Sequence, residues 1–161
     1  METKTLQKAT FAAGCFWHVE DAFRQVKGVT DARVGYTGGF VADPGYKLVC
    51  TDTTGHAEAL EVTFDPAVVS YGDLVEFFWT MHDPTQVNRQ GPDFGKQYRS
   101  AIFVHSPEQR AAAEASKEEL EKSGRFPRPI ATQIVDAGDF WEAEDYHQQY
   151  YAKRGINSCS I

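Results

Sequence analysis

The chain has 161 residues, of which 42% are hydrophobic and 24% are charged, a composition typical of one globular domain. Its formal net charge of −7 argues against nucleic acid or an anionic membrane surface as a partner, because phosphate groups are bound by clustered lysine and arginine. The sequence has no apolar run long enough to span a membrane and no secretory signal at its start, so we expect a cytoplasmic protein that does not bind membranes.

The three cysteines, Cys15, Cys50 and Cys159, do not have the pattern of a disulfide framework or a zinc site. An odd number without an export signal argues against structural disulfides, and no CxxC pair is present. The sequence also lacks both glycine-rich nucleotide-binding motifs. We therefore expect neither a metal nor another cofactor.

The first half of the chain is expected to begin with a strand that leads directly into a helix. Apolar alternation and helical spacing predict, in chain order, a strand over 6–14, a helix over 15–28 ending at Gly28, a strand over 29–39 and a half-buried strand over 59–69. Residues 40–58, between the last two strands, are rich in glycine, proline, aspartate and threonine. We expect a long loop there, of the kind that carries functional residues.

The second half is expected to alternate helices and strands. Its predicted elements are a helix over 70–83 with Ser70 as N-cap, an irregular run over 84–100, a strand over 101–106, a helix over 106–124 capped by Ser106 and ended by Gly124, a strand over 129–140 and a helix over 143–155. This order predicts a single α+β domain over 1–161, a two-layer sandwich with helices packed on a mixed sheet. Residues 152–161 are expected to form a mobile tail.

Cys15 lies in the stretch GCFWHVE, between Gly14 and two aromatic residues, with a carboxylate, Glu20, five positions later. A thiol in the first turn of a helix faces unpaired N–H groups and the positive end of the helix dipole, and both favour the thiolate. The alternative is a small buried side chain in the core. Phe16 and Trp17 cannot both point the same way from a helix, so we expect at least one ring to border the loops, where it can hold a small apolar group.

Four polar residues in the irregular segments are candidates for acid and hydrogen-bond chemistry. Glu58 lies where the first loop becomes a strand, a place where burial can raise the pKa of a carboxyl into the range of a general acid. Tyr46 and Tyr98 offer phenolic donors to an oxygen that gains charge during a reaction, and Asp93 shares a loop with Tyr98. Taken alone, each has an ordinary alternative as a solvated carboxylate or a packing tyrosine.

The other two cysteines have different neighbours. Cys159 stands among small and polar residues three positions from the end, so we expect an exposed, mobile thiol that can resolve a sulfenic acid. Cys50 follows Leu48 and Val49, and we expect it to be buried and structural.

The most distinctive features of the sequence are six stretches that follow one another in order: GCFWHVE, GYTGG, YKLVCTDTTGHAEAL, HDPTQ, RQGPDFGKQYRSAIF and AEDYHQQY. Together, from about Ala12 to Tyr151, they resemble the A class of peptide methionine sulfoxide reductases. The resemblance implies a two-layer sandwich of ferredoxin-like character and thiol-dependent reduction of the S epimer of methionine sulfoxide, free or in proteins. It also implies thioredoxin as the reductant, and we expect the protein to be a monomer.

The resemblance further implies a role for each candidate residue. Cys15 would attack the sulfoxide sulfur and become a sulfenic acid, Glu58 would donate a proton to the oxygen, and Cys159 would resolve the sulfenic acid as a disulfide. The other residues would bind the substrate: Phe16 and Trp17 around the methyl group, Tyr46 and Tyr98 at the oxygen, and Asp93 and Tyr150 beside them.

Two departures from the family pattern stand out. His18 occupies a position where many members have glycine, and we expect it to alter the edge of the thiol pocket. No second cysteine follows Cys159 in the sequence, so thioredoxin is expected to reduce the Cys159 disulfide directly.

From the residues alone, two other functions remain open. A cysteine hydrolase would use Cys15 as acyl acceptor and His56 or His147 as base, and it would form a thioester. A redox-sensing binding module would use the thiols as a switch on partner contacts, and it would show no turnover with dithiothreitol.

Overall fold

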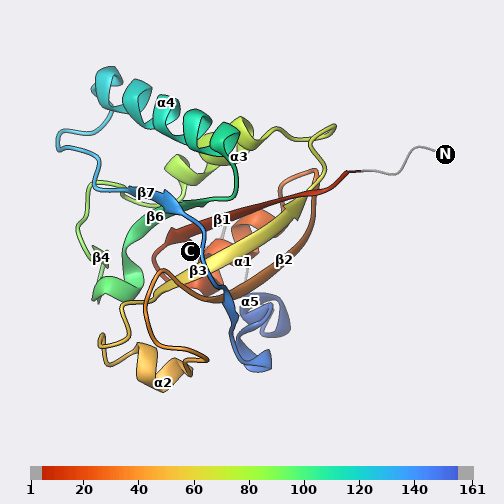
Figure 1. The fold of residues 1–161 in the computed structure, drawn as a ribbon, viewed down its shortest axis with the longest axis vertical. Helices are drawn as coiled ribbons and strands as arrows, with labels where there is room; N and C mark the ends of the chain where they lie inside the picture. The colour runs from red at the N-terminus through yellow and green to blue at the C-terminus, as the bar shows by residue number, and fades with distance from the viewer. Residues whose placement is uncertain (1–4, 156–161) are drawn as a thin grey trace.

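The computed structural model describes residues 5–155, so Cys159 and most of the predicted tail lie outside the described residues. A six-stranded sheet in the order β7-β6-β1-β3-β2-β8 forms the centre of the molecule (Figure 1). All neighbouring strands of this sheet are antiparallel except β6 and β7, which are parallel. The sheet is therefore mixed, and the predicted α+β class is confirmed.

The strands of the large sheet are β1 (Gln7–Ala13), β2 (Val29–Thr37), β3 (Ala57–Phe64), β6 (Ser100–Val104), β7 (Gln133–Asp136) and β8 (Trp141–Glu142). A separate two-stranded sheet pairs β4 (Arg89–Gln90) with β5 (Asp93–Phe94). The helices are α1 (Phe16–Arg24), α2 (Tyr46–Val49), α3 (Tyr71–Thr80), α4 (Pro107–Ser123) and α5 (Tyr150–Lys153), with short 3₁₀ helices η1 (Lys96–Tyr98) and η2 (Asp145–His147). Within residues 5–155, no helix is long and apolar enough to cross a membrane.

The main core lies between the sheet and the helices α1 and α3. Phe11 of β1 stacks on Phe23 of α1, with ring centroids 5.0 Å apart, and on Phe78 of α3 at 5.2 Å. The same face of β3 contributes Leu60 and Val62. Because side chains alternate along a strand, Glu58 continues this row and points to the side of the sheet that α1 covers.

The opposite face of the sheet carries a second, smaller core of alanines and Phe103. After β7 the chain crosses this face on its way to β8 and α5 (Figure 1), and Ala137 and Phe140 pack on the cluster. The prediction that the strand over 59–69 is half-buried is therefore wrong. Strand β3 lies in the middle of the sheet and is buried on both faces over nearly its whole length.

Local sequence signals set the ends of two helices. At the start of α3, Ser70 accepts the N–H of Asp73 and Asp73 accepts the N–H of Ser70, a complete capping box. Helix α4 begins after Ser106, which accepts the N–H of Gln109, and ends at Gly124 in the left-handed region. These caps confirm the predicted starts of both helices and the predicted end of α4.

Three predicted helices end or break differently from the prediction. Helix α3 ends at Thr80, three residues before its predicted end. Helix α1 ends at Arg24 with Gln25 as its C-cap, and Gly28 belongs to the turn that leads into β2. The helix predicted over 143–155 is broken into η2 and α5. The break has a tertiary cause: the Gln148 amide donates to the Val34 and Ala143 carbonyls at 2.9 and 3.0 Å and accepts the Val34 N–H at 3.0 Å. Both loops are also more ordered than predicted, since they contain α2 and the small β4–β5 sheet with η1.

Candidate active site

Cys15 stands at the N-cap of α1, directly after the end of β1. Gly14 makes this sharp turn with φ +91°, and a Cβ atom there would lie 2.9 Å from the side chain of Gln90. Glycine is therefore required at this position, where the chain turns from β1 into α1 and Cys15 follows directly. The thiol is partly exposed.

A surface cavity of about 310 Å³ opens at Cys15. Two of the predicted site residues, Cys15 and Asp93, line it, and His18 lies at its edge as expected. The remaining lining residues are Ala13, Met81, His82, Gln90, Gly91 and Tyr151. Burial lowers the pKa of His82 to about 4, so this imidazole is neutral at pH 7 and supplies no cation to the thiol.

The Cys15 thiol is protonated in the resting site, which differs from the expectation of a thiolate. Burial raises its pKa to about 12, and the carboxylates of Glu58 and Asp93 act in the same direction. The amides of Trp17 and His18 lower the pKa, as a helix start should. Desolvation and the nearby negative charges outweigh them, so forming the thiolate requires that Glu58 lose its charge or that the substrate change the surroundings.

Glu58 lies under the N-terminus of α1 with only 2% of its surface exposed. Its Oε1 accepts the N–H of Phe16, the residue next to Cys15, at 3.4 Å, and its Oε2 accepts an N–H of Gln97 at 2.8 Å. Burial raises the pKa of Glu58 to about 7, although the hydrogen bonds from Gln97, Phe16 and Tyr98 oppose the shift. Such a carboxyl is present in both protonation states near neutral pH, which suits a general acid.

Two tyrosines stand beside this carboxyl. Tyr46, the first residue of α2, and Tyr98, the last residue of η1, are both half-buried. Burial raises the pKa of each phenol, and the charge of Glu58 raises both further. Both hydroxyls therefore keep their protons and can donate hydrogen bonds. The structure thus brings together Cys15, Glu58, Tyr46, Tyr98 and Asp93 from five separate segments.

Gln97 and Cys50 join this group, and neither was predicted to do so. The Gln97 amide, 3% exposed, donates to Glu58 and lies 3.6 Å from the Cys50 sulfur. The prediction that Cys50 is buried is wrong, because the residue is exposed at the end of α2. A four-residue helix on the surface cannot bury its own C-cap residue. Of the two apolar residues before Cys50, Leu48 is exposed and Val49 is buried in the core.

The two rings after Cys15 have different surroundings. Phe16 is buried in the core, 5.7 Å from the ring of Tyr36. Trp17 is half-buried and stacks on Tyr150, with centroids 3.7 Å apart and planes 9° from parallel. Trp17 is therefore the ring that reaches the outer side of α1. Tyr150 supports it, whereas its neighbour Tyr151 lines the Cys15 cavity.

Both histidines that a hydrolase would need are engaged elsewhere. His56 accepts the Gly39 N–H at 3.0 Å and contacts the Val41 carbonyl at 2.7 Å. His147 is fully buried and accepts the indole N–H of Trp17 at 2.9 Å. Neither ring lines the Cys15 cavity, so the structure does not support an acyl-transfer site.

Sequence reasoning missed Tyr151 and Gln97. The repeated tyrosine in HQQYY gave a weak signal for Tyr151, because two adjacent tyrosines on one turn of helix face different directions. Nothing in the sequence marks Gln97, whose role depends on η1 lying against β3. Within the part of the chain that the structure describes, no group of three or more His, Cys, Asp or Glu side chains is arranged to hold a metal ion.

Comparison with known proteins places the whole chain in one family. The family described as peptide methionine sulfoxide reductase matches residues 7–161. A protein named peptide methionine sulfoxide reductase MsrA, from Methanoculleus marisnigri, is 62% identical over 97% of this chain and 95% of its own length.

Solved structures give the same result. Mxr1 from Saccharomyces cerevisiae in reduced form has a TM-score of 0.89 and 36% identity, covering 96% of this chain and 88% of that chain. Mxr1 in complex with Trx2 has a TM-score of 0.64 and 27% identity, covering 92% of this chain and 87% of that chain. Since sequence and fold agree over nearly all of its length, the chain belongs to the A class of the peptide methionine sulfoxide reductase family.

Proposed function

We propose that this reductase transfers the oxygen of methionine S-sulfoxide to Cys15, with Glu58 as the acid. The observation that carries the proposal is the hydrogen bond of 3.4 Å between Glu58 and the N–H of Phe16. It holds a buried carboxyl with a pKa of about 7 against the residue next to the nucleophile. A sulfoxide oxygen leaves sulfur only when protonated, so the acid must lie close to the attacking thiol.

Proton transfer between the two groups follows from their charges. When Glu58 is protonated, the negative charge that raises the pKa of Cys15 is gone, and thiolate formation becomes easier. The Cys15 thiol gives its proton to solvent, and its sulfur attacks the sulfoxide sulfur while Glu58 gives its proton to the oxygen, so that a bond joins the two sulfurs. This bond breaks as the hydroxyl group moves to Cys15 and methionine leaves, and a proton from solvent restores Glu58. In net terms the sulfoxide S–O bond breaks, methionine gains two electrons, and Cys15 loses two and becomes a sulfenic acid.

The remaining residues bind the substrate in this scheme. Tyr46 and Tyr98 donate hydrogen bonds to the oxygen as it gains charge, and Trp17, supported by Tyr150, faces the methyl group. Asp93 lines the cavity at Cys15. The Phe16 ring is buried, so it supports the site from the core side.

Recycling uses Cys159 and thioredoxin. The Cys159 thiol condenses with the Cys15 sulfenic acid to give a disulfide and water, and the dithiol of thioredoxin reduces that disulfide while becoming a disulfide itself. The complex of the similar protein Mxr1 with Trx2 supports this choice of reductant. Replacing Cys159 by serine is expected to leave one turnover per chain intact and to stop turnover with thioredoxin.

The experiment that tests the proposed function uses resolved sulfoxide epimers, dithiothreitol and chromatography of the products. We expect methionine from the S epimer only, and none from either epimer with Cys15→Ser. Methionine formed by Cys15→Ser would refute the assignment of the nucleophile. Consumption of the R epimer at a similar rate would refute the proposed substrate.

A further inference from the structure

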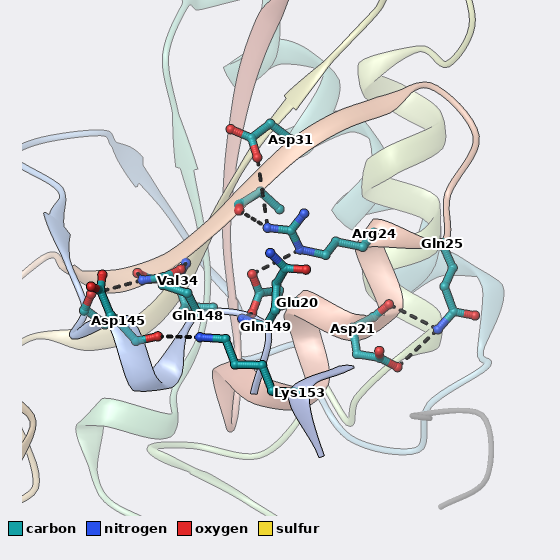
Figure 2. Close-up of polar contacts among 12 residues, drawn as sticks. Glu20, Asp21, Arg24, Gln25, Asp31, Val34, Asp145, Gln148, Gln149 and Lys153 are labelled. Atoms are coloured by element: carbon teal, nitrogen blue, oxygen red, sulfur yellow. Dashed lines mark hydrogen bonds and ion pairs between the residues drawn. The ribbon is translucent and has the colours of Figure 1, made fainter. Parts of the chain in front are cut away.

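Glu20 is a buried carboxylate that the reaction scheme leaves without a role. It lies on α1 five residues after Cys15, with 1% of its surface exposed. Figure 2 shows its contacts: Oε1 accepts the backbone N–H of Gln149 at 2.6 Å, and Oε2 accepts an N–H of Arg24 at 3.1 Å. A carboxylate is placed in a protein interior only where such partners satisfy it, so this position is built for the contact with Gln149.

Arg24 fixes the carboxylate from the other side. Its guanidinium donates to the carbonyl of Ala32 and lies 4.0 Å from Asp31, both on β2. The Glu20 side chain therefore connects three segments: α1, β2 and the chain at Gln149 (Figure 2). We call Glu20, Arg24 and Gln149 the C-terminal latch.

The chain at Gln149 needs an external support. Gln149 has φ +53°, a left-handed conformation that a residue with a side chain rarely adopts. The preceding residue, Gln148, is held to Val34 of β2 through both ends of its side-chain amide. Helix α5, which follows, has only four residues and none of them is buried. A helix this short does not form on its own, so its place depends on the contacts that hold it. These are its N-cap Gln149 on Glu20, Tyr150 on Trp17, and Lys153 Nζ, which donates to the Asp145 carbonyl at 2.9 Å.

Helix α5 lies at the reactive thiol. Its first residue, Tyr150, stacks on Trp17, and its second, Tyr151, lines the Cys15 cavity. Its last described neighbour, Gly155, is four residues before Cys159 in the sequence. Four residues reach at most roughly 14 Å when fully extended. The position of α5 therefore decides how close Cys159 can come to Cys15.

We propose that Glu20 is a positioning residue, which holds α5 against α1 and so serves both halves of the reaction. In the first half it keeps Tyr151 in the cavity and Tyr150 on Trp17. In the second half, which is disulfide formation, it holds the chain up to Gly155, four residues before Cys159. This second part rests on the proposed function of Cys159.

The expected size of the effect follows from chain statistics. Without the latch, the nearest residue before Cys159 that is held to the sheet is Gln148, so the chain from the last held residue to Cys159 lengthens from four to eleven residues. For a chain segment without fixed structure, the effective concentration of a thiol falls with about the −3/2 power of its length, which gives roughly a fivefold slower disulfide. The KM for methionine sulfoxide is expected to rise as well, because Tyr151 leaves the cavity and Tyr150 leaves Trp17.

The test compares Glu20→Ala with Glu61→Ala. Glu61 is a matched control because it is also buried and paired with an arginine, Arg33, at 2.9 Å, but it lies on β3 and has no contact with α5. Hydrogen exchange of the α5 amides is measured in both variants, together with the rate of Cys15–Cys159 disulfide formation after one equivalent of sulfoxide. We expect both variants to lose stability, but only Glu20→Ala to show faster α5 exchange and a roughly fivefold slower disulfide.

The opposite results overturn the proposal. It fails if α5 exchange is unchanged in Glu20→Ala, or if Glu61→Ala shows the same change. If Glu20→Ala does not fold, Glu20→Gln against Glu61→Gln decides, since the amide keeps the shape but loses the charge; equal α5 exchange in that pair contradicts the latch. If the unsubstituted protein forms no Cys15–Cys159 disulfide, the proposed function fails, and the exchange measurement still decides the role of Glu20.

Discussion

At the scale of single residues, the site depends on a thiol and a carboxyl that change each other's charge. Cys15 is not a thiolate at rest, since burial and the charges of Glu58 and Asp93 raise its pKa to about 12. Glu58 in turn stays partly protonated at pH 7 because it is buried. A neutral carboxyl beside a thiolate is the arrangement that attack on a sulfoxide requires, and each group favours that state in the other.

Replacement of the acid is the simplest test at this scale. Glu58→Gln keeps the shape and the hydrogen-bond acceptor of the side chain but removes its transferable proton. We expect methionine formation in a single turnover to slow by roughly a hundred- to ten-thousand-fold. Glu61→Gln, which removes a buried carboxylate far from Cys15, should leave this rate within about twofold of the unsubstituted protein. A similar rate for Glu58→Gln and the unsubstituted protein would exclude Glu58 as the acid.

The pH dependence follows from the same carboxyl. The reactive pair, a protonated Glu58 beside a Cys15 thiolate, carries one proton, as does the resting pair of a Glu58 carboxylate and a Cys15 thiol above pH 7. The single-turnover rate should therefore rise as pH rises to about 7 and stay level above it. The stability falls over the range in which the rate rises: the pKa of folded Glu58 is raised from 4.5, so its contribution is complete below pH 4.5 and lost as pH rises through about 7. Rapid-quench assays and urea unfolding between pH 5 and 9 measure both effects. Neither the levelling of the rate near pH 7 nor the loss of stability should occur in Glu58→Gln.

At the scale of elements, the junction between β1 and α1 places the nucleophile. Gly14 and Gly124 both have positive φ, +91° and +71°, but a Cβ atom would meet Gln90 at 2.9 Å in the first case and nothing within 4 Å in the second. We therefore expect Gly14→Ala and Gly124→Ala each to lose about 1–2 kcal/mol of unfolding free energy from backbone strain.

Activity separates the two glycine variants. Only Gly14→Ala must displace Gln90, which lines the Cys15 cavity, and we expect its single-turnover rate to fall by roughly tenfold or more. Gly124→Ala should keep the rate of the unsubstituted protein. If both variants reduce sulfoxide equally fast, the turn at Gly14 does not set the position of Cys15.

The helices also show which features could be predicted from the sequence and which could not. The caps of α3 and α4 were predictable because Ser70, Asp73, Ser106 and Gly124 act on their own helices. The break between η2 and α5 was not, because Gln148 binds Val34, which is more than a hundred residues away in the sequence. A local sequence pattern indicates a helix cap, but it does not indicate a contact between residues so far apart in the sequence.

At the scale of the whole molecule, the mixed sheet could be predicted, but the covering of its second face could not. Alternation along β3 predicted one apolar face, and that face forms the main core. The other face is buried because residues 137–140 cross it on their way to the C-terminal segment (Figure 1). The surroundings of Cys50 could not be predicted from its sequence neighbours either, since Gln97 of η1 contacts its sulfur.

The candidate site was largely predictable because six ordered motifs resemble one family and mark its residues; taken alone, each of these residues had an ordinary structural alternative. Cys15, Glu58, Tyr46, Tyr98 and Asp93 do converge. The support around them, above all Gln97 and the C-terminal latch, consists of glutamine and glutamate contacts between distant segments. Such contacts leave no periodic pattern in the sequence.

Chemical trapping of the oxidised sulfur tests the central claim most directly. Cys159→Ser is mixed with one equivalent of methionine S-sulfoxide and a reagent that labels sulfenic acids, and labelled peptides are mapped by mass spectrometry. We predict one methionine per chain and a matching amount of label on Cys15. Methionine formed without label on Cys15, or with the label on Cys50, would contradict the assignment of Cys15 as the sulfur that receives the oxygen.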